Sequence, residues 1–186
     1  MKYKVFPDMA IFGKALGNGY AINAILGKKD IMLAAKNTFI SSTFWTERSG
    51  SVAALATLNS MNKLKSWEII SRIGTNIKKN WEKLAKKHGL KLVIQGLDAI
   101  PNFYFKSKYN IEYKTFISQE MLKNNILASN VVFVCIFHNS KLLQRYFYNL
   151  DKIFKKIRNC EDQIENIYNL LDYKKSITGF RENVNK

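Results

Sequence analysis

Lys14 is the residue whose type and setting best suit covalent chemistry. It stands in FGKALGNGY, between Gly13 and Ala15, where an apolar run ends and a glycine-spaced run begins. A lysine that forms a Schiff base needs an amine that is partly deprotonated near neutral pH, so desolvation must lower its pKa. Flanking glycines let a flat molecule lie close to the backbone. The alternative is an ordinary solvent lysine beside a hairpin turn, and composition alone favours that alternative.

A hydroxyl residue, Thr43, precedes a run of small residues in ISSTFWTERSGSVAALATL at positions 40–58. Phosphate groups bind well against hydroxyls and free N–H groups near the start of a helix. The position therefore suits a phosphate contact, and a plain turn or capping residue is the alternative interpretation.

The elements that would position these residues follow from hydrophobic period and turn signals. Short strands are expected at 9–12 and 20–26, joined by the turn Gly17-Asn18-Gly19, and later strands at 90–95, 99–106 and 130–137. Helices are expected at 28–35, from Glu47 onward, and at 66–88, 115–124, 140–158 and 161–171. Gly89 and Asn125 stand where left-handed helix stops are expected.

The string PDMAIFGKALGNGYAINAILGKKDIM at 7–32 resembles the Schiff-base lysine segment of class III pyridoxal-phosphate aminotransferases, in the glutamate-semialdehyde aminomutase-like branch. Pro7-Asp8, Gly13-Lys14, the glycine turn, Gly27 and KKDIM stand in that family's order. The resemblance implies that Lys14 is catalytic and carries pyridoxal 5′-phosphate as a Schiff base. It also implies that Thr43 binds the cofactor phosphate from the neighbouring subunit. FWTER departs from the aminomutase's own small-residue version, which leaves the exact substrate open. Nothing in the sequence separates an aminotransferase from an aminomutase.

Residues 59–172 are similar to the family's small C-terminal domain. FISQEMLKNNILAS at 116–129 matches a helix-turn-strand element, and His138 matches a structural residue at the start of the closing helix. The resemblance implies an α/β fold, the C-terminal part of a fold-type I transferase. Its parts would be a remnant of the large cofactor-binding domain at 1–58, the small domain at 59–172 and a polar tail at 173–186.

The family's large N-terminal portion has no counterpart in this sequence. That portion supplies the phosphate loop, the aromatic side chain stacked on the ring and the aspartate paired with the pyridine nitrogen. We therefore expect the C-terminal portion of a longer enzyme, from a truncated or split gene or a fragment, with little or no activity alone. For the complete enzyme the resemblance implies an amino donor, a carbonyl acceptor and a homodimer. Arg48, Arg72 and Arg145 are unranked candidates for binding a substrate carboxylate.

The net charge of +16 raises a different class of function, a basic module that binds nucleic acid. The basic residues come as pairs on expected helix faces, such as Lys78-Lys79 and Lys155-Lys156, a pattern typical of a solvated face. Nucleic acid is therefore not expected as a partner. A third class is a non-catalytic dimerisation or interaction remnant, whose mark would be an exposed apolar patch over 9–12, 20–26 and 39–45.

Several other features narrow the expectations. The sequence contains no run of 18 apolar residues, so no membrane span is expected. Its first residues lack the apolar core of a signal peptide, so a cytoplasmic location is expected. Cys135 and Cys160 have no metal-binding spacing, so no metal site is expected, and Cys135 in NVVFVCIF is expected to be a small buried hydrophobe.

Overall fold

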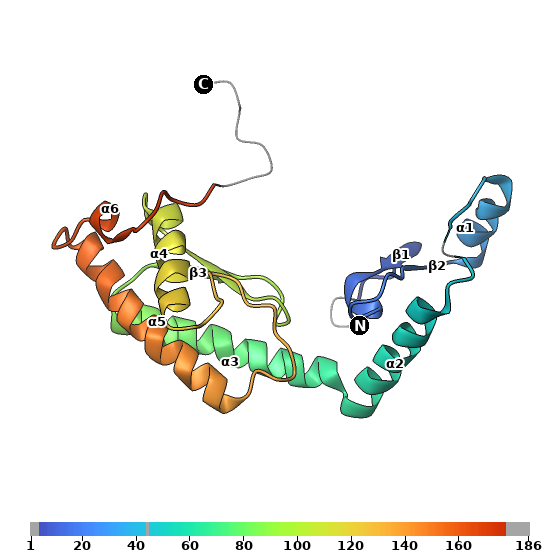
Figure 1. The fold of residues 1–186 in the computed structure, drawn as a ribbon, viewed down its shortest axis with the longest axis horizontal. Helices are drawn as coiled ribbons and strands as arrows, with labels where there is room; N and C mark the ends of the chain where they lie inside the picture. Colours follow the sequence, from blue (N-terminus) through green and yellow to red (C-terminus); the bar gives the residue numbers. More distant parts are fainter. Residues whose placement is uncertain (1–3, 44, 178–186) are drawn as a thin grey trace, which may run out of the picture. The chain divides into compact units, whose positions relative to one another are not determined.

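The computed structural model describes residues 4–43 and 45–177 and divides the chain into two compact units (Figure 1). The first unit is Met1–Ser66 and the second is Trp67–Lys186. The boundary after Ser66 lies later in the chain than the predicted boundary after Leu58. The assignment of 1–58 and 59–172 to the family's large and small domains stays a prediction.

The first unit is built on an antiparallel hairpin of β1 (Met9–Phe12) and β2 (Ala24–Gly27). A 3-10 turn, η1 (Lys14–Leu16), follows β1, and α1 (Lys29–Leu33), η2 (Ala34–Asn37) and α2 (Arg48–Leu64) follow β2. The strand predicted at 9–12 is confirmed. The strand predicted from Tyr20 begins only at Ala24, because the backbone at 20–22 packs against Gly17 and the start of α2 instead of pairing with β1.

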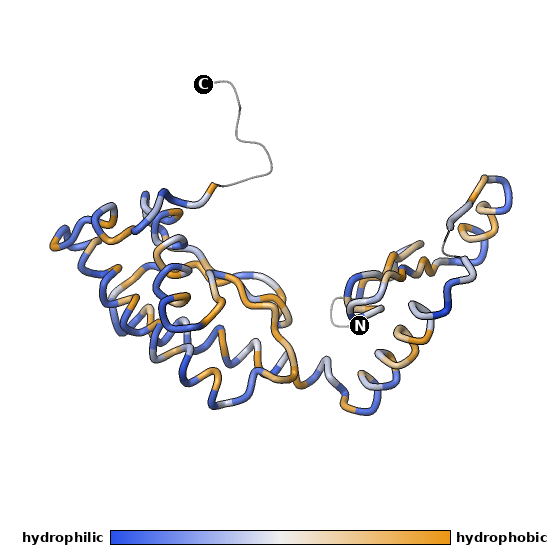
Figure 2. The backbone as a smooth tube through the Cα atoms, viewed as in Figure 1, coloured by the Kyte–Doolittle hydropathy of each residue, from blue (hydrophilic) through white to orange (hydrophobic). Residues whose placement is uncertain are grey.

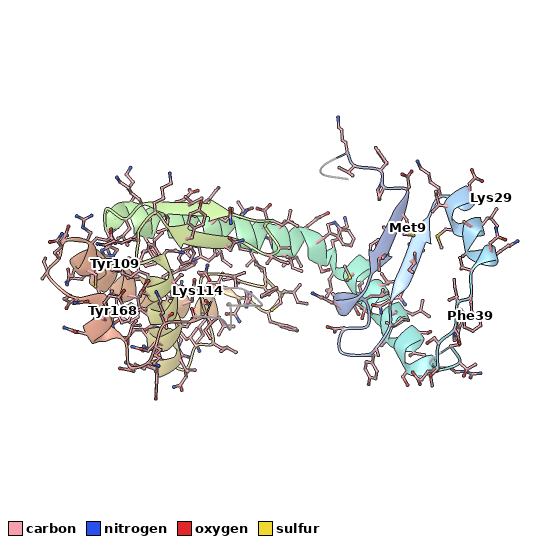
Figure 3. All side chains as sticks on the ribbon, turned by 90° about the horizontal axis from the view of Figure 1, so that it is seen from above. Met9, Lys29, Phe39, Tyr109, Lys114 and Tyr168 are labelled. Atoms are coloured by element: carbon pink, nitrogen blue, oxygen red, sulfur yellow. The ribbon has the colours of Figure 1, made fainter. Side chains whose placement is uncertain are left out.

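This unit buries almost none of its apolar side chains. Before Ser66, the buried residues among those described are Gly17, Gly50 and Ala54. Hydrophobic positions recur along the backbone of this unit (Figure 2), and Figure 3 draws its side chains, with Met9 and Phe39 labelled. Large apolar side chains lie exposed on the hairpin, on the following loop and on α2: Met9, Ile11, Phe12, Tyr20, Ile25, Leu26, Phe39, Ile40, Trp45, Val52, Leu55 and Leu58. Exposed apolar residues are thus present in all three segments, 9–12, 20–26 and 39–45, that would carry the patch of a non-catalytic interaction remnant.

The second unit packs three long helices around a hairpin. They are α3 (Ser66–Lys87), α4 (Asn110–Lys123) and α5 (Ser140–Glu161), and the hairpin pairs β3 (Leu92–Gln95) with β4 (Asn102–Phe105). A single turn of helix, α6 (Ile167–Leu170), is shorter than the helix predicted at 161–171. Gly89 and Asn125 have φ angles of 62° and 56°, so both predicted left-handed helix stops are confirmed.

Aromatic side chains form the core of the second unit. Trp81 of α3 and Phe103 of β4 are both fully buried, and their ring centroids lie 4.7 Å apart in an edge-to-face arrangement. The indole N–H of Trp81 donates a hydrogen bond to the hydroxyl of Tyr146 on α5, at 3.0 Å. Burial raises the pKa of Tyr146 above its ordinary range, so this hydroxyl stays protonated. These contacts tie α3, β4 and α5 together.

The buried strand predicted at 130–137 is wrong. Apart from one isolated bridge between Asn102 and Val131, the described chain there is irregular, and the N–H groups of Val132 and Val134 donate to the carbonyls of Pro101 and Ala99. Val134 is buried, but its neighbours Phe133 and Cys135 point outward, so the prediction of a buried Cys135 is also wrong. The segment hydrogen-bonds to the chain from Ala99 to Phe103, where Pro101 has no N–H to donate, so a regular ladder does not form.

His138 stands just before α5, as predicted for a structural residue. A ring nitrogen, Nδ1, accepts a hydrogen bond from the backbone N–H of Cys135 at 3.3 Å. The helix itself is capped by the next residue, Asn139, whose side chain accepts from the N–H of Leu142 at 3.0 Å. His138 therefore shapes the turn that leads into the capped helix.

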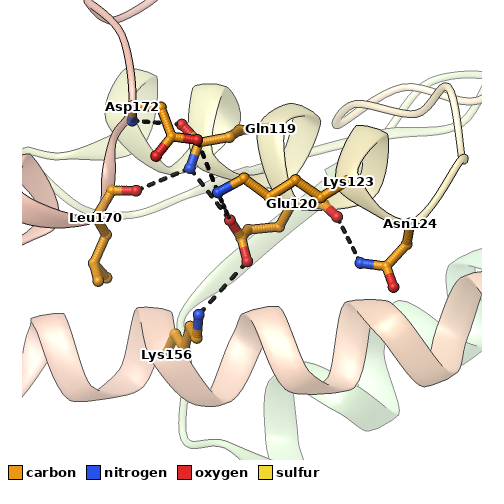
Figure 4. Close-up of polar contacts among 7 residues, drawn as sticks. All are labelled: Gln119, Glu120, Lys123, Asn124, Lys156, Leu170 and Asp172. Carbon is orange, nitrogen blue, oxygen red and sulfur yellow. Dashed lines mark hydrogen bonds and ion pairs between the residues drawn. The ribbon is translucent and has the colours of Figure 1, made fainter.

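The polar segment after α6 is held on α4 as far as the structure describes it (Figure 4). Gln119 donates to the carbonyl of Leu170 at 2.9 Å and accepts from the N–H of Asp172 at 2.8 Å. Lys123 pairs with both Asp172, at 2.8 Å, and Glu120, at 2.9 Å. The N–H of Ser176 also donates to Thr115 at 2.9 Å, so the first residues of the predicted polar tail are docked on α4.

A buried carboxylate anchors the same segment. Glu112 is only 3% exposed, and it accepts hydrogen bonds from Lys175 at 3.0 Å and from the Tyr168 hydroxyl at 3.2 Å. Burial by itself raises the pKa of Glu112, but the bonds from Lys175 and Tyr168 outweigh it, and the pKa lies below the ordinary value. The ionised form is thus favoured in the folded unit.

No helix in the described ranges combines the length and the apolar character that crossing a bilayer requires.

We predict that Glu112→Gln lowers the free energy of unfolding by about 1–3 kcal/mol at pH 7, because Lys175 loses its buried counter-charge. Since the folded pKa of Glu112 is lowered, its contribution is present above the unfolded pKa and is lost as the pH falls through the folded pKa. Urea unfolding followed by tryptophan fluorescence should therefore show the two proteins converging in acid. Glu82→Gln, at an exposed site on α3, is the control, and an equal loss there would contradict the prediction.

Candidate functional site

Lys14 lies at the exit of the first strand, as the sequence predicts for a reactive lysine. Gly13 separates it from β1, and Lys14 opens η1 with a left-handed φ of 48°. This conformation is uncommon for a residue with a side chain and costs on the order of 1 kcal/mol, so neighbouring contacts must hold it. The N–H of Leu16 donates to the carbonyl of Gly13 at 3.1 Å and closes the turn.

Lys14 lines an open cavity of about 720 Å³ in the first unit. Other side chains of the lining come from the turn after η1 and from the loop before α2: Tyr20, Asn23, Ser42, Trp45 and Glu47. Lys14 is itself an exposed residue, and the cavity that it lines also carries aromatic, amide, hydroxyl and carboxylate groups. The groups that the sequence alone did not single out are Tyr20, Trp45 and Glu47; the departure FWTER was the available signal for the last two.

Two close backbone approaches shape the cavity wall at 20–22. A Cβ atom on Gly17 would lie 2.1 Å from the carbonyl oxygen of Tyr20, and one on Gly50 would lie 2.7 Å from that of Ala21. Contacts this short exclude any side chain at these two positions without a backbone shift. The segment is therefore held between the turn after η1 and the first turn of α2, which brings Lys14 and the start of α2 to the same cavity.

Glu47 caps the start of α2. The carboxylate accepts from the N–H of Ser49 at 3.1 Å, from the hydroxyl of Ser49 at 2.8 Å and from the N–H of Gly50 at 3.4 Å. The backbone and side-chain bonds from Ser49 lower the pKa of the Glu47 carboxyl, so it is ionised at neutral pH. The first N–H groups of α2, where an anion would otherwise bind, are occupied by this side chain.

Thr43 is an exposed turn residue. Its neighbours Ser42 and Trp45 line the Lys14 cavity, but Thr43 itself is not part of that lining. Position 44 lies outside the described residues. The structure thus places Thr43 beside the cavity in sequence, and its role as a phosphate contact stays a prediction.

Of the three candidate arginines, Arg48 belongs to the same unit as Lys14, and Arg72 and Arg145 belong to the second unit. Arg48 is the first residue of α2, next to Glu47, yet no arginine is among the described residues that line the cavity. Arg145 lines a different cavity in the second unit, and Arg72 is exposed on α3. Among the described residues, no group of three or more His, Cys, Asp or Glu side chains could hold a metal ion.

Comparison with known families identifies the chain. Residues 1–133 match the model of the class-III aminotransferase family, so the chain belongs to that family. The 3-aminobutyryl-CoA aminotransferase of Cloacimonas acidaminovorans is 30% identical over 132 residues, which are 67% of this chain and 31% of the relative. The glutamate-1-semialdehyde 2,1-aminomutase of Saccharolobus islandicus is 26% identical over 145 residues, 73% of this chain and 34% of the relative.

Solved structures confirm the fold. The internal-aldimine form of FumI from Sphingopyxis sp. MTA144, which holds pyridoxal phosphate, superposes with a TM-score of 0.74 at 22% identity, over 89% of this chain and 40% of that one. Acetylornithine aminotransferase from Elizabethkingia anophelis superposes with a TM-score of 0.71 at 21% identity, over 83% and 42%. The predicted fold class, the C-terminal part of a fold-type I transferase, is correct. The chain spans about a third of the length of the curated relatives it matches.

We predict that Gly50→Ala loosens the cavity wall although alanine is the better helix former. The added Cβ would meet the carbonyl oxygen of Ala21 at 2.7 Å, so the backbone at 20–22 must move. Hydrogen–deuterium exchange at 18–24 and 48–54 should be faster by about tenfold. Ser60→Ala, at an exposed position of α2, changes helix propensity without a clash and should leave exchange unchanged. Equal protection in Gly50→Ala and the parent chain would refute this packing argument.

Proposed function

We propose that this chain supplies the catalytic lysine, Lys14, of a pyridoxal-phosphate-dependent aminotransferase or aminomutase. The observation that carries the proposal is the placement of Lys14 at the exit of β1, in the lining of a cavity that the start of α2 also lines. The complete enzyme would take a small-molecule amino donor and a carbonyl acceptor, as a homodimer. An aminomutase would return the amino group to the neighbouring carbon of the same molecule, and an aminotransferase would pass it to another.

The residues of the cavity fit one end of pyridoxal phosphate. The Lys14 amine suits its aldehyde, and the flat side chains of Tyr20 and Trp45 suit an aromatic ring. The phosphate end has a different requirement. Because Glu47 occupies the first N–H groups of α2, the phosphate would need the Thr43 hydroxyl, from this or a second subunit, and groups from outside this sequence.

Lys14 would have two tasks in the reaction. Its Nζ atom would hold the cofactor through the aldehyde carbon, and after an amine substrate displaces it, the free amine would take a proton from the substrate's α-carbon. When bound, pyridoxal phosphate supplies the electron sink for this chemistry. The left-handed backbone at Lys14 and the glycine beside it would orient the amine.

The contacts that hold the cofactor tightly in the family have no counterpart in this sequence. Charged and stacking contacts contribute on the order of 1–3 kcal/mol each. Without the phosphate loop, the ring stack and the aspartate, binding should be weaker by several powers of ten, at about 1.4 kcal/mol per decade. We therefore propose that the chain alone has no appreciable transaminase activity and that the remainder of the enzyme restores it.

The test is to add pyridoxal phosphate, reduce with borohydride and map the labelled lysines by mass spectrometry. We expect more label at Lys14 than at other lysines, labelling that saturates only at high pyridoxal phosphate concentration, and no turnover of an amino donor. Lys14→Arg should lose the main labelled peptide, and Lys36→Arg, at an exposed site in η2, should retain it. Label spread evenly over surface lysines would count against Lys14 in this chain, and turnover by this chain would show that the missing contacts are dispensable.

A further inference from the structure

Lys14 and Glu47 are the two charged side chains among the described residues that line the cavity. They come from different elements: Lys14 opens η1, and Glu47 is the residue on which α2 begins. The remaining polar groups of the lining are neutral, from Asn23, Ser42 and Ser51 among others. The cavity therefore presents one carboxylate, and no arginine, to whatever molecule reacts with the lysine.

The carboxylate of Glu47 is held in place. It accepts three hydrogen bonds within one helical turn, two of them from Ser49 and the third from the N–H of Gly50. Gly50 in turn lies against the backbone of Ala21, so the start of α2 cannot slide along the cavity wall without a clash. A fixed charge acts on a ligand more strongly than a mobile one, because no ordering is needed when the ligand arrives.

The charge at this position is negative in the working pH range. Hydrogen bonds from Ser49 lower the pKa of Glu47, so the carboxylate stays ionised well below neutrality. The N–H groups of Ser49 and Gly50 at the positive end of the α2 dipole already donate to Glu47. They are therefore not available to attract an incoming anion. A substrate carboxylate placed in this cavity would meet the charge of Glu47, and the described lining offers it no cationic side chain apart from the reacting lysine.

We infer that Glu47 is a specificity-determining residue, and that the Lys14 cavity selects amine or carbonyl substrates whose second functional group is cationic, such as a diamine or an amino aldehyde. The inference rests on the proposed role of Lys14 and gives that site a substrate class. A substrate whose second group is a carboxylate is disfavoured, and a neutral one stands between the two.

The experiment uses the whole chain and three benzaldehydes of matched size, which carry a para trimethylammonium, a para carboxylate or a neutral para substituent. Each is reduced onto the protein with borohydride, and the label on each lysine peptide is measured by mass spectrometry. Lys36, exposed in η2, is the internal reference for intrinsic reactivity. We expect the ratio of cationic to anionic label at Lys14 to exceed the ratio at Lys36 by about threefold at low salt, and to fall toward it at high salt.

Two variants separate charge from structure. Glu47→Gln should bring the ratio at Lys14 to that of Lys36, because it removes the charge and keeps one capping oxygen. Ser49→Ala removes a hydrogen bond from the same carboxylate but leaves its charge, and should retain the preference. An unchanged preference in Glu47→Gln would overturn the inference.

The remaining outcomes also decide. Three results with the unmodified chain would overturn the inference. The ratio of cationic to anionic label at Lys14 could equal that at Lys36, Lys14 could prefer the anionic aldehyde, or none of the three aldehydes could label Lys14. The readout does not depend on pyridoxal phosphate. Pyridoxal phosphate could fail to label Lys14 while Lys14 still prefers the cationic aldehyde and Glu47→Gln still removes that preference. In that case the proposed function fails and the charge selection by Glu47 stands.

Discussion

The burial of Phe103 is the interaction on which the second unit depends. Its ring contacts Trp81 at 4.7 Å, Phe105 at 5.7 Å and Phe154 at 6.0 Å, so one side chain of β4 joins α3 to α5. Burying an aromatic side chain of this size contributes about 1.5–3 kcal/mol, and edge-to-face contacts add to it. The helices that this core positions then carry the polar network of α4, including the buried Glu112 and the segment that follows α6.

The first unit is organised by a different constraint, the close approach of backbones. It has no comparable core in its described residues; Gly17 and Gly50 allow the segment 20–22 to pack where a side chain would not fit, while Ile11 is 69% exposed and Phe39 is 95% exposed. A two-stranded hairpin with exposed apolar side chains is marginal unless another surface covers it. The candidate reactive lysine thus lies in the part of the chain that depends most on an additional surface.

Glu47 links local structure to the chemistry of the cavity. The carboxylate that starts α2 is also the negative charge in the lining of the cavity that Lys14 lines, so helix capping and cavity electrostatics share one side chain. The same arrangement explains why the helix start is not an anion site here, and why a phosphate would need other groups. A substitution at this position acts on both properties, which is why a neighbour of unchanged charge, Ser49, is informative beside it.

The sequence by itself determined the family, the strand before Lys14, the long helices and the left-handed stops at Gly89 and Asn125, because hydrophobic period, turn glycines and the lysine motif are local signals. It did not reveal the irregular path of 130–137, the docked segment at 171–177 or the delayed start of β2 at Ala24. Those outcomes depend on which distant backbone supplies a partner. For the same reason only the tertiary structure decided that Tyr20, Trp45 and Glu47 share a cavity with Lys14, since residues from separate elements meet there through close packing at Gly17 and Gly50.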